Sequence, residues 1–325
     1  MSGEITLLEA ISQALRDEMR ADPRVFLIGE DLGRYGGAFR VTAGFLDEFG
    51  PQRIVDTPIS ESGFTGAAIG AAMAGLRPVV EFQFIDFMAN AFDMIVNFAG
   101  PNRYRWGQGV PLVLRGPSGG RVSGSAFHSA NPEAYYHRAP GLKIVYPAFV
   151  EDAYGLMRAA IRDPDPVLFF EHKYLYRRIK GTLPADLETV PIGTARVARA
   201  GRDATVVTWA AMVHVALETA EKLAGEGIEL EVIDLRPIKP MDEEAVLASV
   251  RKTSRALVLS EEPYSGSVAG DVAARIAERA FWHLDAPLVR VTCLDTPVPY
   301  SPPLEDHYLP NAQKLEARVR ELLRA

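Results

Sequence analysis

The sequence has almost no cysteine, no long hydrophobic segment and no excess of positive charge. Its one cysteine, Cys293, excludes a disulfide within the chain and a metal cluster of several cysteines, which is typical of a reducing compartment. The longest run of small and apolar residues, 67–76, is about half of the roughly 20 residues that cross a bilayer, and no basic-then-apolar leader is recognised. We therefore expect a cytoplasmic protein without a membrane segment.

Acidic residues outnumber basic ones, 42 to 35, and the formal net charge is −7. No long block of lysine or arginine interrupts this balance. The chain therefore lacks the general attraction for phosphate backbones or anionic lipids that nucleic-acid-binding and membrane-surface proteins use. The expected partners are proteins and small molecules.

Several common catalytic motifs are also missing. The sequence contains no Walker motif, no HExxH and no GxGxxG between a strand and a helix, and its six histidines are scattered. The glycine-rich stretch 116–124 follows a predicted strand, but glycines in such a loop more often form turns than bind phosphate. The sequence therefore contains none of the motifs that would indicate nucleotide binding or a zinc protease.

What the sequence does contain is a regular alternation of strand and helix signals. The length of 325 residues, with 48% hydrophobic and 24% charged residues, suits a globular protein of two domains. Short β-branched runs alternate with segments of helical period, which predicts an α/β fold with a mostly parallel sheet covered by helices in each domain. The strands expected in the first domain are Val25–Gly29, Pro78–Gln83, Pro111–Arg115, Leu142–Tyr146 and Val167–Glu171. Its expected helices are Thr6–Arg20, Ser62–Ala74, Asp86–Phe98 and Val150–Arg162.

A stretch without clear period, Lys180–Pro191, predicts a linker, so we place the domains at 1–185 and 192–325. The strands expected in the second domain are Ala204–Thr208, Glu229–Asp234, Arg255–Ser260 and Leu288–Thr292. Its expected helices are Met212–Ala224, Glu243–Arg251, Val268–Arg279 and Ala312–Leu323.

The helix expected from Ser62 has small residues four positions apart, Gly66, Gly70 and Ala74. One face is therefore nearly bare backbone, and another helix could approach it closely. Tight internal packing and a subunit interface explain this face equally well. Ser60 or Ser62 is the expected N-cap, and from its position alone Glu61 is a first-turn acid that faces the helix dipole.

This stretch, taken with seven others, resembles the β chain of the decarboxylating component of 2-oxo acid dehydrogenase complexes, which uses thiamine diphosphate. The resemblance covers nearly the whole chain, in order. The matching pieces are GED (29–31), DTPISESGF (56–64), AGLRPVVEFQFIDF (74–87), FHS (127–129), PGLKIVYP (140–147), LFFEHKYLYR (168–177), VIDLRPIKP (232–240) and DTPVPY (295–300). It implies a pyrimidine-binding domain followed by a transketolase-like C-terminal domain.

The resemblance implies that Glu61 binds the pyrimidine ring nitrogen of the cofactor. Protonation of that nitrogen favours the imino form of the adjacent amino group, which can then remove the proton from the thiazolium carbon. Phe87 matches the aromatic residue that contacts the pyrimidine ring, although it also begins an apolar helix stripe of residues 87, 91, 94, 95 and 98. Ile59, Gln83 and Glu30 match positions near the same ring.

His128 lies in a loop of small and polar residues, 123–131, and not on an apolar face. The resemblance places it at the substrate end of the cofactor. An imidazole that titrates near neutral pH can donate a proton to a lipoyl sulfur during acyl transfer, or stabilise the charge that develops there.

Two metal ions also follow from the resemblance. A structural potassium ion would be held by Asp163, Asp165 and the backbone carbonyls of Leu112 and Ala160, although relatives often have asparagine where Asp165 stands. Magnesium would be held by the α chain, since the GDG segment that binds it in this family has no counterpart here and the one Gly-Asp pair, 270–271, precedes valine. The chain thus carries half of a cofactor site.

The resemblance therefore implies the β subunit of an α2β2 heterotetramer that decarboxylates a 2-oxo acid and passes the acyl group to lipoyl on an acyltransferase core. The alternatives are an acetoin-cleaving or split transketolase-like enzyme with the same cofactor, and a catalytically silent assembly subunit. The substrate stays open, because 56–64 is closer to pyruvate enzymes and 168–177 to branched-chain enzymes.

Overall fold

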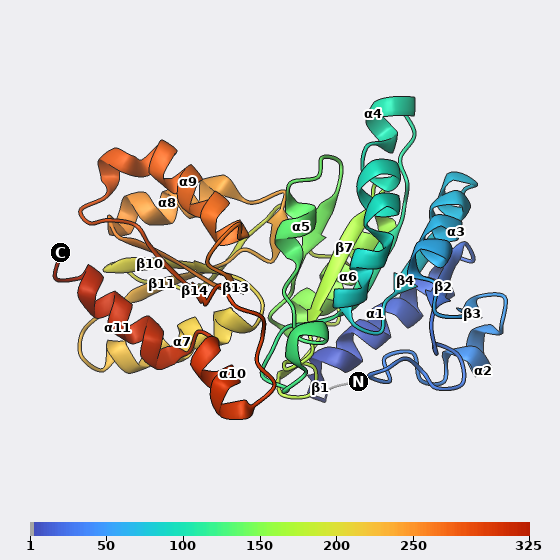
Figure 1. Cartoon of the computed structure of the whole chain (residues 1–325), viewed down its shortest axis with the longest axis horizontal. Helices are drawn as coiled ribbons and strands as arrows, with labels where there is room; N and C mark the ends of the chain where they lie inside the picture. Colours follow the sequence, from blue (N-terminus) through green and yellow to red (C-terminus); the bar gives the residue numbers. More distant parts are fainter. Residues whose placement is uncertain (1–2) are drawn as a thin grey trace. The chain divides into compact units, whose positions relative to one another are not determined.

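The computed structural model describes residues 3–325 and divides into two compact units. The first unit contains residues 3–118 and 135–192, and the second contains 119–134 and 193–325. Each unit has a central sheet with helices packed against it, which confirms the predicted α/β fold (Figure 1). The predicted boundary near residue 190 separates the two units along most of the chain. It does not account for segment 119–134, which belongs to the second unit.

The sheet of the first unit is parallel, with the strand order β6-β7-β5-β4-β2-β3. Its central strands are buried on both faces, as expected when helices cover both sides. The strands are β2 (Val25–Gly29), β3 (Ile54–Asp56), β4 (Arg77–Glu81), β5 (Val113–Ser118), β6 (Lys143–Val145) and β7 (Val167–His172). The predicted strands are all present, and β3 is an addition.

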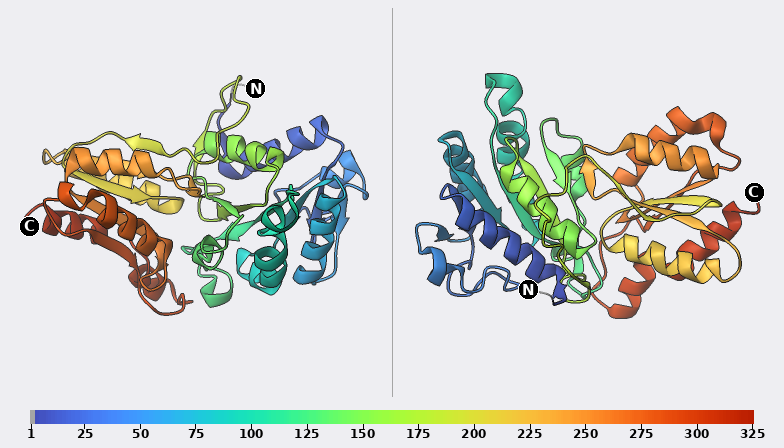
Figure 2. Two further views of the ribbon diagram at one scale, coloured as in Figure 1. Left: turned by 90° about the horizontal axis from the view of Figure 1, so that it is seen from above. Right: turned by 180° about the vertical axis from the view of Figure 1, so that it is seen from behind.

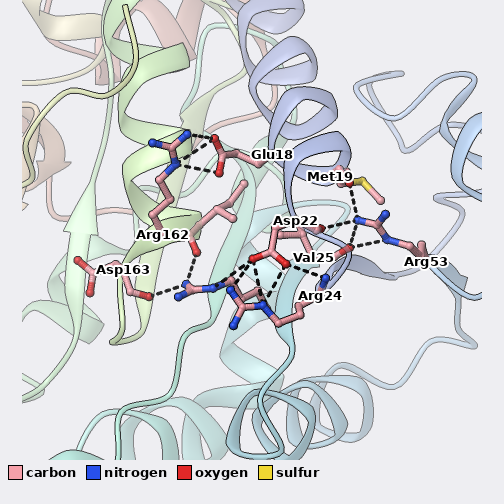
Figure 3. A network of polar contacts seen from close by, with 10 residues as sticks. Glu18, Met19, Asp22, Arg24, Val25, Arg53, Arg162 and Asp163 are labelled. Carbon is pink, nitrogen blue, oxygen red and sulfur yellow. Dashed lines mark hydrogen bonds and ion pairs between the residues drawn. The ribbon is translucent and has the colours of Figure 1, made fainter.

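Helices α1 (Leu7–Ala21) and α6 (Val150–Arg162) lie side by side on the opposite face of this sheet from α3 (Glu61–Met73) (Figure 2). Helix α1 begins with a capping box in which Thr6 Oγ1 accepts from Glu9 N at 3.2 Å and Glu9 Oε2 accepts from Thr6 N at 2.7 Å. The buried Glu18 of α1 receives Arg162 Nη2 of α6 at 2.8 Å (Figure 3). This ion pair links the two helices.

The helix predicted at Asp86–Phe98 is not an α-helix. It consists of a 3-10 helix, η1 (Ile85–Ala91), followed by a π-helix, η2 (Met94–Ala99). The two segments differ from the α-helical 3.6 residues per turn, so residues spaced by four and seven do not stay on one face. The predicted core stripe is accordingly wrong at Phe98, whose side chain is exposed.

The second unit has the strand order β14-β13-β10-β11-β9, in which only β9 is antiparallel to its neighbour. Its strands are β9 (Arg196–Arg199), β10 (Ala204–Thr208), β11 (Leu230–Asp234), β13 (Ala256–Pro263) and β14 (Val289–Cys293). Helices α8 (Glu243–Thr253) and α9 (Val268–Ala280) cover one face, and α7 (Ala211–Ala224) and α11 (Ala312–Leu322) cover the other (Figure 1). Cys293 is buried.

Strand β9 and helix α10 (Pro302–Tyr308) were not predicted from the sequence. The two prolines at the start of α10 occupy the first turn, where a helix tolerates them. In the sequence, however, two adjacent prolines indicate a loop. The remaining short elements are β1 (Ile5–Thr6), α2 (Phe45–Phe49), α4 (Asn102–Trp106), η3 (Ser125–Phe127), α5 (Glu133–His137), β8 (Lys180–Gly181), β12 (Pro237–Lys239) and η4 (Phe281–His283). No helix within residues 3–325 is both long and apolar enough to cross a membrane.

Candidate active site

The predicted cofactor residues of the first unit gather at the carboxyl edge of its sheet. Glu30 directly follows β2, and Gln83 follows β4, the neighbouring strand. Parallel strands end at the same edge, which is where α/β proteins bind ligands. Gln83 Nε2 donates to Asp31 Oδ2 at 2.8 Å, so the segments after β2 and β4 are in direct contact.

Glu61 is the first residue of α3, and its side chain is only 8% exposed. Ser60 occupies the N-cap position, as one of the two predicted candidates, but its side chain makes no capping bond and donates instead to Pro58 O at 3.1 Å. Ser62 Oγ donates to the backbone carbonyl of Asn90. The helix N-terminus therefore has no hydroxyl cap, and the Glu61 carboxylate is the negative group of its first turn.

Glu30 and Glu61 interact electrostatically. Burial raises the pKa of Glu30 above its usual value, and the negative charges of Glu61 and Asp31 raise it further. Glu30 Oε1 is buried and has no hydrogen-bond partner among the described residues. The site thus pairs Glu61 with a second carboxyl group whose pKa is raised above its usual value.

Three aromatic side chains of the first unit, including Phe87, contact one another in series. Phe87, in η1, is partly buried and meets Phe84 edge to face with ring centroids 6.2 Å apart. Phe84 in turn meets Phe39 at 5.6 Å. Ile59, by contrast, is 81% exposed, so this chain provides no packing for its side chain. The role of Ile59 near the cofactor stays a prediction.

His128 is the one predicted site residue that belongs to the second unit. It follows η3, its backbone N–H donates to Ser125 O at 3.3 Å, and its side chain is partly buried. This loop lies within the predicted first domain, 1–185, because that boundary was placed at the linker 180–191 alone. The structure thus separates Glu61 and His128 between two units.

The four residues predicted to hold potassium lie at the end of α6 and beside it, but their oxygens already have protein donors. Lys143 Nζ donates to both carboxylate oxygens of Asp163, at 2.7 and 2.6 Å, and Arg103 Nε donates to Asp165 Oδ1 at 2.7 Å. The carbonyls of Leu112 and Ala160 accept backbone N–H groups.

Arg77 Nη1 also donates to the Asp163 carbonyl, at 3.3 Å. No group of three or more His, Cys, Asp or Glu side chains within residues 3–325 is arranged to hold a metal ion. The corner therefore fits a metal cation poorly, because two protein cations already neutralise its carboxylates.

A buried ionic network joins three neighbouring strands of the first unit and was not predicted from the sequence. Arg115, 1% exposed, donates to Glu171 through Nε at 2.6 Å and Nη2 at 2.7 Å, and it also binds Glu81. The Tyr176 hydroxyl donates to Glu171 Oε2 at 2.5 Å. Burial raises the pKa of Glu81 to about 7, although Arg115 opposes the shift. The signal was a charged residue in each of three neighbouring apolar strands.

The small-residue face of α3 is largely open in this chain. A Cβ at Gly70 would meet nothing within 4 Å, whereas at Gly66 it would lie 3.5 Å from Met94 Sδ. Ala74, the third residue of the stripe, is exposed. A Cβ at Gly66 would make only an ordinary van der Waals contact, so packing within this chain does not require glycine at either position.

Comparison with known proteins covers both units. Family models described as "Transketolase, pyrimidine binding domain" and "Transketolase, C-terminal domain" match residues 3–178 and 193–315. The chain is 46% identical to 2-oxoisovalerate dehydrogenase subunit beta of Bacillus subtilis (strain 168), covering 98% of each chain.

It is 45% identical to pyruvate dehydrogenase E1 component subunit beta-1, mitochondrial, of Arabidopsis thaliana, covering 96% of this chain and 87% of the relative. It is also 42% identical to acetoin:2,6-dichlorophenolindophenol oxidoreductase subunit beta of Bacillus subtilis (strain 168), covering 99% and 98%. Among solved structures, a split gene transketolase described as an inactive beta4 tetramer superposes with a TM-score of 0.81 at 24% identity, covering 99% of each chain. That likeness shows the shared fold.

Proposed function

Because this chain belongs to the family of β subunits of the decarboxylating (E1) component of 2-oxo acid dehydrogenases, we propose that it forms, with an α chain, an enzyme that decarboxylates a 2-oxo acid on thiamine diphosphate. The acyl group then passes to lipoyl on an acyltransferase core. The observation that carries the proposal is the buried Glu61, paired with a second buried carboxyl group at the carboxyl edge of a parallel sheet.

The residues present fit the pyrimidine end of thiamine diphosphate. When bound, the cofactor supplies the electron sink for decarboxylation. Glu61 would hold a proton at the pyrimidine ring nitrogen, and Glu30 would keep a second proton close to it, since its pKa is raised. Phe87 would contact the ring, while Ile59 and Gln83 would lie near it.

His128 would serve the later half of the reaction. Acyl transfer to lipoyl leaves a sulfur that needs a proton, and an imidazole can donate one near neutral pH. His128 is partly buried in a loop of small and polar residues. We therefore assign His128 to acyl transfer and Glu61 to cofactor activation.

The α chain would supply magnesium and the diphosphate half of the site, in an α2β2 heterotetramer. The exposed small-residue face of α3 suits a close contact with another subunit, and the second unit would join β chains and offer a docking face for the core. The isolated chain should therefore bind thiamine diphosphate weakly or not at all. Tight, magnesium-dependent binding in calorimetry without an α chain would contradict the half-site proposal. The single buried cysteine agrees with a cytoplasmic location.

The substrate separates this proposal from its alternatives. Pyruvate and branched-chain 2-oxo acids are both acted on by similar proteins, and the 42% identical acetoin oxidoreductase subunit supports acetoin cleavage as the second candidate. The test is a steady-state assay of the αβ assembly with pyruvate, 2-oxoisovalerate and acetoin, with lipoyl domain as acceptor. Lipoyl acylation from a 2-oxo acid supports the proposal. Turnover of acetoin alone contradicts it, and failure to bind cofactor would indicate a silent assembly subunit.

A further inference from the structure

Residues 119–134 are inserted in the first unit along the chain but belong to the second unit in space. This segment includes His128, so the contacts that hold it decide where the proposed proton donor lies. Most of them come from parts of the chain far away in the sequence, whereas Glu133 belongs to the segment itself. Three acidic side chains, Glu133, Glu261 and Glu305, take part, and each is almost fully buried.

Glu305, on α10, accepts two backbone N–H groups of the segment. Its Oε1 accepts from Arg121 N at 2.9 Å, and its Oε2 accepts from Ser123 N at 3.0 Å. Hydrogen bonds to a carboxylate are about twice as strong as those between neutral groups. Both oxygens are therefore used to fix a single turn of the segment.

Glu261, on β13, holds both ends of the segment. Its Oε1 accepts from Gly120 N at 2.6 Å and from Asn131 Nδ2 at 3.2 Å. Trp209 Nε1 donates to Glu133 Oε1 at 3.0 Å next to the second end. The backbone N–H groups of this glycine-rich stretch are thus bound by carboxylates, which agrees with the interpretation that it forms turns and does not bind phosphate.

The turn held by Glu305 is strained. Arg121, Ser123 and Ser125 have φ values of 66°, 55° and 63°, in the left-handed region that residues other than glycine rarely adopt. Such conformations persist only where the surroundings impose them. Without the carboxylate of Glu305, the turn should relax toward ordinary backbone angles.

Relaxation of this turn would move His128, because Gly124 lies directly against it. A Cβ at Gly124 would be 2.8 Å from the His128 carbonyl oxygen and 3.0 Å from its Cβ. Glycine therefore allows the turn and the histidine to pack in contact. If the backbone moves at Ser123, the adjacent Gly124 moves with it and displaces His128, which Gly124 contacts.

We propose that Glu305 and Glu261 are positioning residues for acyl transfer, which fix the strained turn and through it the place of His128. The inference rests on the role proposed above for His128. A displacement of about 1 Å at a reacting group can cost about 10²-fold in rate. The carboxylates of the second unit would therefore control the second half-reaction without contacting the substrate.

The test is Glu305→Gln in the αβ assembly, since glutamine keeps the size but replaces one acceptor oxygen by an N–H donor. We expect lipoyl acylation to fall about 10- to 100-fold, and decarboxylation with an artificial electron acceptor to fall much less. Tryptic cleavage after Arg121, followed by mass spectrometry, should become faster because the turn is released. Glu231→Gln is the matched control: Glu231 is also buried in the second unit and accepts from Gly201 N and Ser249 Oγ, away from the segment.

Gly124→Ala provides a second variant that leaves both carboxylates in place, and it should lower lipoyl acylation in the same selective way. Unchanged acylation in Glu305→Gln, when His128→Ala lowers it, would overturn the inference. If His128→Ala itself has no effect, the proposed role of His128 fails, and the tryptic readout alone decides the positioning. Faster cleavage in Glu305→Gln than in Glu231→Gln then supports a fixed turn, and equal cleavage overturns it.

Discussion

The negative charge of Glu61 raises the pKa of Glu30, the residue that directly follows β2. Burial makes the larger contribution to the shift, and Asp31 adds a smaller one. Carboxyl groups whose pKa values are shifted by their surroundings and by a neighbouring charge are common in catalytic sites. The raised pKa suggests that Glu30 keeps a proton close to Glu61 at pH values where an exposed glutamate would have lost it.

Glu61→Gln should slow activation of the cofactor in the assembled enzyme. The substitution preserves size and removes the acid, so the exchange of the thiazolium carbon proton with deuterium should fall by about 10² to 10⁴. NMR of quenched samples measures this exchange. A rate equal to that of the wild type would exclude Glu61 from the role.

Glu30→Gln should change the pH dependence of the same exchange. In the wild type, Glu30 loses its proton above the usual range of a glutamate and then places a second negative charge beside Glu61, which should lower the rate. The variant stays neutral and should lack this decline. Asp31→Asn is the matched control and should have a smaller effect, since Asp31 makes the smallest contribution to the shift. Identical pH profiles for the wild type and Glu30→Gln would contradict the pairing.

Glu81 should make the stability of the chain depend on pH. Its pKa is about 7 in the folded protein and 4.5 as a free side chain, so between these values the folded state binds more protons than the unfolded state. The free energy of unfolding should then fall as pH rises from about 5 to 7, by up to about 3 kcal/mol. Urea denaturation at several pH values measures this slope, which should be smaller in Glu81→Gln. If the free energy of unfolding depends on pH equally strongly in Glu81→Gln, groups other than Glu81 cause this dependence.

Potassium should not stabilise this protein. Asp163 and Asp165 are already paired with Lys143 and Arg103, so a metal cation would have to displace a protein cation. Melting temperatures in potassium chloride and in choline chloride of equal ionic strength should therefore agree. Arg103→Met should become sensitive to potassium, because it leaves Asp165 without its cation. A melting temperature of the wild type that is higher in potassium chloride than in choline chloride would contradict this prediction and support a bound potassium ion.

The sequence predicted the elements that carry the site better than the contacts within it. The positions of Glu30 after a strand and of Glu61 at the start of a helix follow from local patterns and are confirmed, whereas Gln83, expected as the last strand residue, lies two residues beyond the end of β4. The raised pKa of Glu30 could not be predicted, since it depends on burial and on a charge 31 positions away. The continuous helix expected at Asp86–Phe98 failed because an apolar stripe does not distinguish α-helical from 3-10 and π-helical pitch.

By itself, the sequence determined the α/β alternation, the order of the strands along the chain and the residue types at the site, because periodicity and turn signals act over a few neighbouring residues. Only the tertiary structure decided which unit holds His128. Its segment is bound by Glu261 and Glu305, which lie 141 and 184 positions from the backbone N–H groups they accept. Nothing local specifies such pairings, since they form only when the sheet and helices of the second unit have packed and buried those carboxylates, which must then find donors.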